Sequence, residues 1–339
     1  MNQPASPQSH SEHGVPKYNR AIHRLAKFVV VWALLVICLG GKTKSKEAGL
    51  TIPQPVIFSW VPEWLTTENI SAEYSHRIVA FLLTCSALAL MCLVLSSDVR
   101  TGVRTLAISL VGAIVAQAAL GALTVYYLAA AKSSIPHAVL AQITFCLAAS
   151  LAVVTSPAWM SDAKPVVSDE KPTLLRLSKA LVIAFFVQLL LGSALRHDGM
   201  AEALRNGHAI VFWSHLIAHI MGAMAVTFFL ARVLMRVFRM HREQKEIMSP
   251  ARWIMMLLAL QLCLGMGAAV LKVMTKDYES ANSPPALRVW VATAHVATGA
   301  VMFAFSVVLA LNAYRFATPN AQWRDLASHP TSDGLGVPA

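Results

Sequence analysis

Four histidines stand near the start of four strongly apolar segments, and they indicate a chemistry of paired ligands. They are His76, His137, His219 and His295. An ionisable residue inside an apolar segment of membrane length is costly, and it marks a functional site by default. Zinc needs three or four protein ligands, and no Cys or carboxylate completes such a set in the second half of the chain. A haem iron needs two axial ligands, for which His is a common choice. We therefore expect one bis-histidine haem site in each half, with iron as the metal.

Small residues follow three of these histidines, either directly or about one helical turn later. They would leave room for a flat macrocycle beside the imidazoles. They are Ala138, Ala141, Gly222 and Gly299.

Glu73 gives the first site a second chemical feature. It precedes His76 by three residues, so the two side chains share a helical face. A carboxylate beside a reacting group can accept a proton or stabilise positive charge. The matching position in the second half is Leu216, so the asymmetry predicts a catalytic site in the first half and an electron-transfer site in the second. The alternative is that Glu73 caps its segment while facing water.

Arg77 is expected to pair with a haem propionate, because guanidinium binds carboxylates in a fork geometry. The alternative is an anchor at the membrane interface. His215 is an alternative ligand to His219, since it lies one turn earlier on the same face. The shared pattern H-x-x-x-A, His76 to Ala80 and His219 to Ala223, favours His219.

The composition predicts the elements that hold these residues. The chain of 339 residues is 56% hydrophobic and 13% charged, and about twenty apolar residues suffice to cross a bilayer. The fold class is therefore all-α, a polytopic membrane protein with eight transmembrane helices. The expected spans are residues 24–41, 77–97, 105–129, 136–156, 178–195, 213–235, 252–274 and 289–313.

Glycine and histidine motifs recur between the two halves. Gly40 ends the first span and Gly192 the fifth, while Gly121 and Gly265 lie near the ends of the third and seventh. Four spans per half make both halves enter the membrane in the same direction, which predicts two four-helix bundles related by a parallel repeat. The expected divisions are a disordered tail (1–22), an N-terminal half (23–157), a linker (158–177), a C-terminal half (178–315) and a second tail (316–339).

Charge predicts the orientation. With both termini in the cytoplasm, the cytoplasmic segments hold 18 of the 28 Lys and Arg residues, as the positive-inside rule requires. The net charge of +11 is then a matter of topology and anionic lipid, and nucleic-acid binding is excluded. The simplest location is a bacterial inner membrane, with the histidines toward the outer face. All five cysteines fall inside spans, where we expect small core side chains and no disulfides.

The motifs together resemble the haem A synthase family over nearly all of residues 22–315. They are Glu73-x-x-His76-Arg77, "GGKTKSKEAGLTIP" after the first span, "LGALTV" in the third, H-x-x-x-A opening the fourth and "LGSALRHDG" ending the fifth. The resemblance implies an oxidoreductase of cytochrome oxidase assembly that oxidises a methyl group of haem O to a formyl group by successive hydroxylations. It implies Glu73 as the catalytic carboxylate, His76 and His137 as ligands of the substrate haem, and His219 and His295 as ligands of a haem b cofactor.

Two other functions use parts of the same pattern. A dihaem b-type cytochrome that takes electrons from quinol would use the four histidines without needing Glu73. A transporter built from parallel repeats is more distant, since it would place ionisable groups near the bilayer midplane. The expected partners of a haem A synthase are a haem O synthase upstream, an electron acceptor such as a quinone, and the lipid membrane. A homo-oligomer is an open alternative.

Overall fold

The computed structural model describes residues 18–45, 68–126, 130–167, 169–197, 209–275 and 285–319. These residues form helices and no strands, in agreement with the expected all-α class. The predicted disordered tail (1–22) lies outside the described residues as far as residue 17, but its last residues are not disordered, because a helix already begins at Arg20. The loop after the first span lies outside the described residues from 46 to 67. The helices are α1 (Arg20–Ser45), α2 (Glu68–Ser97), α3 (Thr101–Tyr126), α4 (Ala130–Val154), α5 (Pro157–Met160), α6 (Leu174–His197), α8 (Ala209–Met240), α9 (Lys245–Met274) and α10 (Ala286–Ala317).

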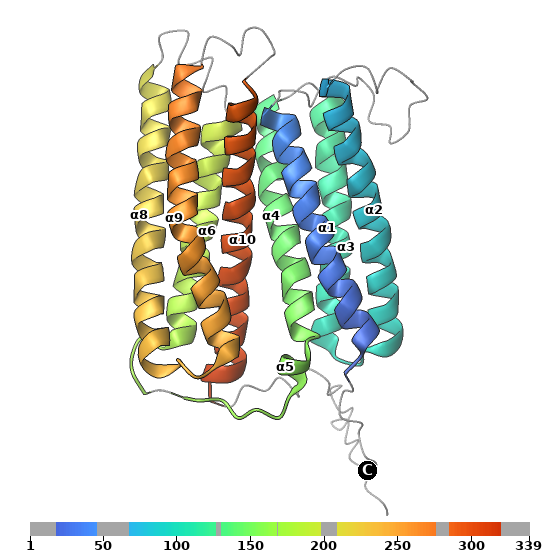
Figure 1. The fold of residues 1–339 in the computed structure, drawn as a ribbon. Coiled ribbons are helices and arrows are strands. Elements are labelled where there is room, and N and C mark those ends of the chain that lie inside the picture. Colours follow the sequence, from blue (N-terminus) through green and yellow to red (C-terminus); the bar gives the residue numbers. More distant parts are fainter. Residues whose placement is uncertain are drawn as a thin grey trace, which may run out of the picture.

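Eight of these helices are long and apolar enough to cross a membrane, which confirms the predicted number of spans. They stand side by side and roughly parallel, with α5 at one end of the bundle (Figure 1). The short α5 was not predicted. It forms because Ser156 accepts a hydrogen bond from the Trp159 backbone N–H and Pro157 begins the turn, a standard helix start.

The helices of each half close into a ring. In the first half α2 contacts α1 and α3, and α4 contacts α3 and α1. In the second half α8 contacts α6 and α9, and α10 contacts α9 and α6. The four histidine-bearing helices are therefore diagonal pairs, α2 opposite α4 and α8 opposite α10. The halves meet where α10 contacts α1 and α4 and where α4 contacts α6 (Figure 1).

The interior is packed with aliphatic side chains, and the perimeter is equally apolar. Leu90, Leu181 and Leu309 are at most 1% exposed, while many large apolar side chains of α8 and α9 face outward, as expected where lipid is the solvent. The expectation that the cysteines fill the core is wrong for three of them. Cys85, Cys92 and Cys263 are exposed, Cys38 is half-buried and only Cys146 is buried; all five are free.

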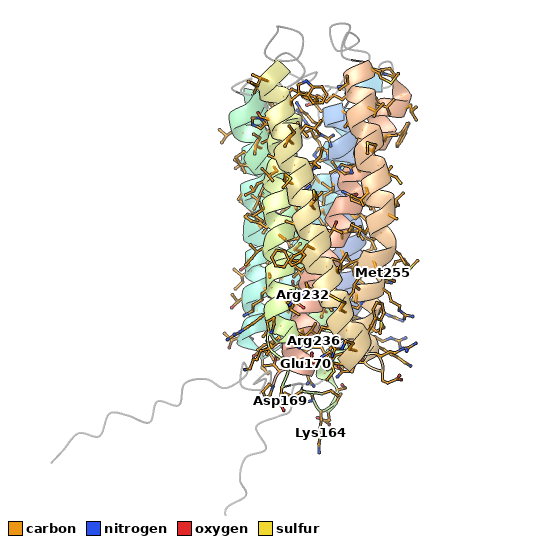
Figure 2. The ribbon with its side chains drawn as sticks, turned by 90° about the vertical axis from the view of Figure 1, so that its left-hand side faces the viewer. Lys164, Asp169, Glu170, Arg232, Arg236 and Met255 are labelled. Carbon is orange, nitrogen blue, oxygen red and sulfur yellow. The ribbon has the colours of Figure 1, made fainter. Side chains whose placement is uncertain are left out.

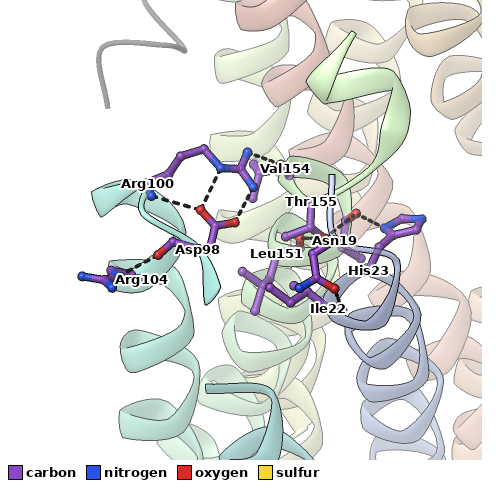
Figure 3. Close-up of polar contacts among 10 residues, drawn as sticks. Asn19, Ile22, His23, Asp98, Arg100, Arg104, Leu151, Val154 and Thr155 are labelled. Atoms are coloured by element: carbon purple, nitrogen blue, oxygen red, sulfur yellow. Dashed lines mark hydrogen bonds and ion pairs between the residues drawn. The ribbon is translucent and has the colours of Figure 1, made fainter. Parts of the chain in front are cut away.

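Polar contacts join the helices at the end that carries α5. Arg100 pairs with Asp98 at 2.6 Å and donates to the Val154 carbonyl at 2.8 Å, which links the α2–α3 turn to the end of α4 (Figure 3). Arg236 at the end of α8 pairs with Glu170 of the linker at 3.0 Å (Figure 2). Arg315 of α10 donates to the Ser161 carbonyl at 2.6 Å. These contacts fix one end of the bundle, and the histidines lie toward the other.

Candidate functional site

Each of the four histidines packs its ring against a glycine of the preceding helix. A Cβ atom added to these glycines would meet the histidine Cε1 at 3.2 Å or less, which is tighter than ordinary van der Waals contact. The glycines therefore supply the space in which the imidazoles lie. The distances are 2.9 Å for Gly40 and His76, 3.2 Å for Gly121 and His137, 2.9 Å for Gly192 and His219, and 2.9 Å for Gly265 and His295.

The same glycine–histidine contact occurs in each consecutive pair of membrane-spanning helices. The repeat is therefore visible in units of two helices as well as in the predicted units of four. The first helix of each pair carries the glycine, and the second carries the histidine. The pairs are α1 and α2, α3 and α4, α6 and α8, and α9 and α10. All four histidines lie in the first half of their helices, and these helices all begin at the same end of the bundle (Figure 1). The predicted common depth of the four histidines is thus what the structure shows.

The imidazole of His137 is oriented by a backbone carbonyl of the preceding helix. His137 Nδ1 lies 3.1 Å from the Gln117 carbonyl oxygen, one turn before Gly121. With its proton in that bond, Nδ1 leaves Nε2 free as a ligand, which is the usual arrangement of metal-binding histidines. Val36 precedes Gly40 by four residues, and Gln261 precedes Gly265 by four residues, as Gln117 precedes Gly121. The carbonyls of Val36 and Gln261 interact with His76 and His295, although the two Nδ1 atoms lie outside hydrogen-bonding geometry.

The histidines of the second half face each other across the bundle. The ring centroids of His219 and His295 are 6.3 Å apart and the ring planes stand at 79°. Two imidazoles that share one metal through bonds of about 2.0–2.1 Å have ring centres roughly 6 Å apart. The pair therefore fits a single iron between them. Two imidazoles are also the number of axial ligands that a haem iron takes. No group of three or more His, Cys, Asp or Glu that could hold a metal occurs in the described part of the chain.

The first half brings together all four residues expected there. His76 and His137 lie close enough to interact electrostatically. The Glu73 carboxylate, only 3% exposed, pairs with Arg77 Nη2 at 2.5 Å. Glu73 is thus buried beside the histidine pair, and the alternative of a water-facing cap is wrong. Arg77 holds Glu73 in place, and its expected contact with a haem propionate stays a prediction.

His215 and His219 occupy different environments. His219 packs on Gly192 and faces His295. His215 Nδ1 lies 2.8 Å from the Val211 carbonyl of its own helix, in an exposed contact. The geometry favours His219 as the ligand, as the aligned motifs do.

One expectation about the small residues is wrong. Gly222 and Gly299 do not face an open space, because a Cβ on Gly222 would clash with Gln188 Oε1 and one on Gly299 would lie 3.0 Å from Gln261 Nε2. These glycines accommodate glutamine side chains. The sequence carries a signal for these glutamines, since "QAALG", "QLLLG" and "QLCLG" place Gln one turn before three of the four histidine-packing glycines.

Arg196 was also missed, although it belongs to the "LGSALRHDG" motif. Its Nη2 donates to the Gly41 carbonyl at 2.8 Å and to Ser45 Oγ at 2.7 Å, so α6 of the second half holds the end of α1 in the first. Gly41 in turn packs against Thr293 of α10. A Cβ added to Gly41 would lie 3.4 Å from Thr293 Cγ2. Adjacent glycines thus contact both sites, Gly40 at His76 and Gly41 two residues before His295.

One histidine outside the spans has a shifted pKa. Burial lowers the pKa of His241, between α8 and α9, and the charge of Arg236 lowers it further, while a hydrogen bond to Gln244 at 2.7 Å opposes both effects. His241 lies at the end opposite the four paired histidines and takes no part in their site.

Comparison with known proteins supports the reading of the motifs. Residues 6–149 match the model of the COX15-CtaA family, described as cytochrome oxidase assembly protein. No curated protein matches the chain. The family match covers His76, His137, Glu73 and Arg77, and it confirms the resemblance over this part of the chain.

Proposed function

We propose that this chain, whose residues 6–149 match the model of the cytochrome oxidase assembly protein family, is a haem A synthase that converts haem O to haem A. The family supports a role in cytochrome oxidase assembly and involves haem. The finer statement is ours: the first half binds haem O as substrate, and the second half binds haem b as cofactor.

The observation that carries the proposal is the asymmetry between two otherwise matching histidine pairs. Both pairs lie on diagonal helices at one depth, and each histidine rests on a glycine of the preceding helix. Among the described residues, only the first pair has a buried carboxylate, Glu73, one turn away. Two identical histidine pairs would be expected of a protein that only transfers electrons. A carboxylate at one pair and none at the other favours an enzyme that couples a reaction at the first pair to electron transfer at the second.

The residues of the first site act by position and charge. His76 and His137 would hold the substrate haem through its iron, which fixes the macrocycle relative to α2. With water as the source of the oxygen, oxidation of a methyl to a formyl group replaces two C–H bonds by one C=O bond and releases four protons and four electrons, which an acceptor such as a quinone would take up. Glu73 would accept a proton released at the methyl or stabilise positive charge there. Arg77, ion-paired with it, would keep the carboxylate oriented.

The second site would hold haem b through His219 and His295, and this cofactor would supply one-electron chemistry. Its own residues keep the two imidazoles 6.3 Å apart by packing them on Gly192 and Gly265. The contacts of Gly41 and Arg196 join the two sites across the interface between the halves. Electrons released at the first site would leave through the second to an acceptor such as a quinone.

We further propose a bacterial inner membrane, both termini in the cytoplasm and the two sites toward the outer face. The distribution of Lys and Arg supports this orientation, since Arg232 and Arg236 lie toward the C-terminal end of α8 (Figure 2), and Arg239 and Arg242 follow them in the sequence. A haem O synthase would supply the substrate.

Co-expression with a haem O synthase tests the proposal, in a host that makes no haem A. The haems of the membranes are extracted and separated by chromatography. Haem A, or its hydroxylated intermediate, is the expected product. Unconverted haem O beside a purified chain that carries two haems B, with quinones added, would instead establish a dihaem cytochrome.

A further inference from the structure

Three basic side chains from three helices gather beside the histidine pair of the second half. Arg196 of α6 and Arg288 of α10 lie close enough for their charges to repel each other, and the charge of Arg196 also reaches His295. Lys272 Nζ of α9 lies 3.5 Å from the carbonyl oxygen of Leu195, the residue before Arg196. Like charges are costly inside a membrane, so a cluster of this kind indicates the binding of an anion.

Arg196 binds only neutral oxygens among the described residues. Its Nη2 donates to the Gly41 carbonyl at 2.8 Å and to Ser45 Oγ at 2.7 Å, both on α1. A guanidinium group has five N–H donors in a planar fork that matches a carboxylate. The two bonds to α1 therefore orient the Arg196 side chain and leave the rest of its fork for a negatively charged group.

Helix dipoles do not account for Arg288. A cation is favoured in the last turn of a helix, where Arg196 and Lys272 lie, and is disfavoured in the first turn. Arg288 is the third residue of α10, a helix with no acidic residue in its first turn and no side-chain cap from Pro285. The N-terminus of α10 and the Arg288 side chain thus both favour an anion at this place.

A buried hydroxyl group beside Arg196 points to the same ligand. Thr293 of α10 is 6% exposed, and its Oγ1 finds no hydrogen-bond partner among the described residues. Thr293 packs against Gly41, whose carbonyl binds Arg196. Buried hydroxyl groups without a partner are rare, and they mark positions where an oxygen of a ligand or of a water molecule is bound.

We propose that Arg196 and Arg288 bind the propionate groups of the haem that His219 and His295 hold. A haem carries two carboxylates on an apolar macrocycle, and a carboxylate inside a membrane needs a partner of opposite charge. Arg288 precedes His295 by seven residues and therefore shares its helical face.

Arg196 has the matching position on the other side of the pair. It follows Gly192, on which the His219 ring packs, by four residues, which is one helical turn. Each imidazole thus has a guanidinium group one or two helical turns away, toward the end of the bundle at which α6 ends and α10 begins (Figure 1). This inference rests on the proposed binding of haem b by the second half, and it names the residues that would hold the charged groups of that haem.

Esterified haem tests the proposal without any turnover. The full chain is made in a host that makes no haem, and its membranes are titrated with haem b or with the dimethyl ester of haem b, whose propionates carry no charge. All chains carry His137→Ala, which leaves the second histidine pair as the complete one. With Arg196 and Arg288 present, haem b should bind about 10–100-fold more tightly than the ester.

The substitutions remove this preference step by step. Arg196→Gln keeps an amide donor for α1 and should lower the preference for haem b about tenfold, and adding Arg288→Gln should abolish it. Arg232→Gln is the control, because Arg232 is an exposed cation toward the opposite end of the bundle (Figure 2). Its preference should equal that of the chain with all three arginines.

A second measurement needs no substitution of His137. In the full chain purified with its haems, Arg288→Gln should lower the equilibrium constant for reduction of haem b about tenfold, which is about 59 mV for one electron. The reason is that a nearby cation stabilises the reduced iron. This measurement decides if the Arg196→Gln chain does not fold, and an unchanged potential would then overturn the inference.

The outcomes separate this inference from the proposed function. An equal loss of affinity for haem b and for the ester in Arg196→Gln would overturn the inference, since Arg196 would then support the fold or bind another anion such as a lipid phosphate. An equal affinity of the two forms for the chain with both arginines would overturn it as well. A chain that shows the expected preference but makes no haem A refutes the enzyme alone. A second pair that binds neither form refutes both.

Discussion

Adding one methyl group at Gly192 should displace the His219 ring and weaken haem b binding. In Gly192→Ala the new Cβ would lie 2.9 Å from His219 Cε1, while ordinary contact begins at 3.4 Å, so the ring must move by about 0.5 Å. Metal–ligand distances tolerate about 0.2 Å. We therefore expect the affinity for haem to fall by about 10–100-fold, as is typical when a ligand loses its correct orientation.

Two other glycines provide graded controls for this substitution. Gly121→Ala needs a movement of only about 0.2 Å to relieve a contact of 3.2 Å with His137 Cε1, so its effect should be mild. Gly112→Ala meets nothing within 4 Å, and it should keep full haem content while stabilising α3 by about 1 kcal/mol through helix propensity. Haem per chain is measured by the pyridine haemochrome method after purification. Wild-type haem content in Gly192→Ala, with an unchanged electron paramagnetic resonance spectrum, would refute the role assigned to the glycines.

Three further predictions concern other parts of the chain. His295→Ala should lose the haem b signal, whereas His215→Ala should keep it; the reverse result in difference spectra would mean that the ligands are misassigned. Arg196→Met removes two hydrogen bonds between the halves and should lower the melting temperature in detergent by about 4–8 °C; an unchanged midpoint would contradict the bridging role. Because the pKa of His241 lies below its ordinary value of 6.5 in the folded chain, the unfolded chain binds more protons below that pH, so stability should be full above pH 6.5 and fall as the pH drops. Melting curves of His241→Gln should lose part of this dependence, and an identical pH profile would exclude His241 as its source.

The sequence predicts the features that depend on local pattern. Apolar length alone sufficed for the eight spans, because any helix in lipid must satisfy its backbone internally. The histidines could be placed at one depth because their spans run in one direction. Glu73 could be placed beside His76 because helical spacing is fixed.

The features that the sequence did not predict depend on which helices pack together. Gly222 reads as space for a ligand until Gln188 of another helix is seen to fill it. Cys85 and Cys263 lie in apolar spans, but in a membrane protein both faces of a span are apolar, so hydrophobicity does not tell the core from the lipid side. The contact between Arg196 and Gly41 joins residues 155 positions apart, and no spacing rule applies across that distance.

The proposed function requires that Glu73 performs chemistry at the first site while the second site holds haem b permanently. The most direct test is to count the haems of wild type and Glu73→Gln after co-expression with a haem O synthase. The substitution keeps the shape of the side chain and removes its negative charge. We expect haem A from the wild type and, from Glu73→Gln, only haem O at the same total haem content and with the same haem b. Normal haem A from Glu73→Gln, or the loss of haem b in that variant, would contradict the account.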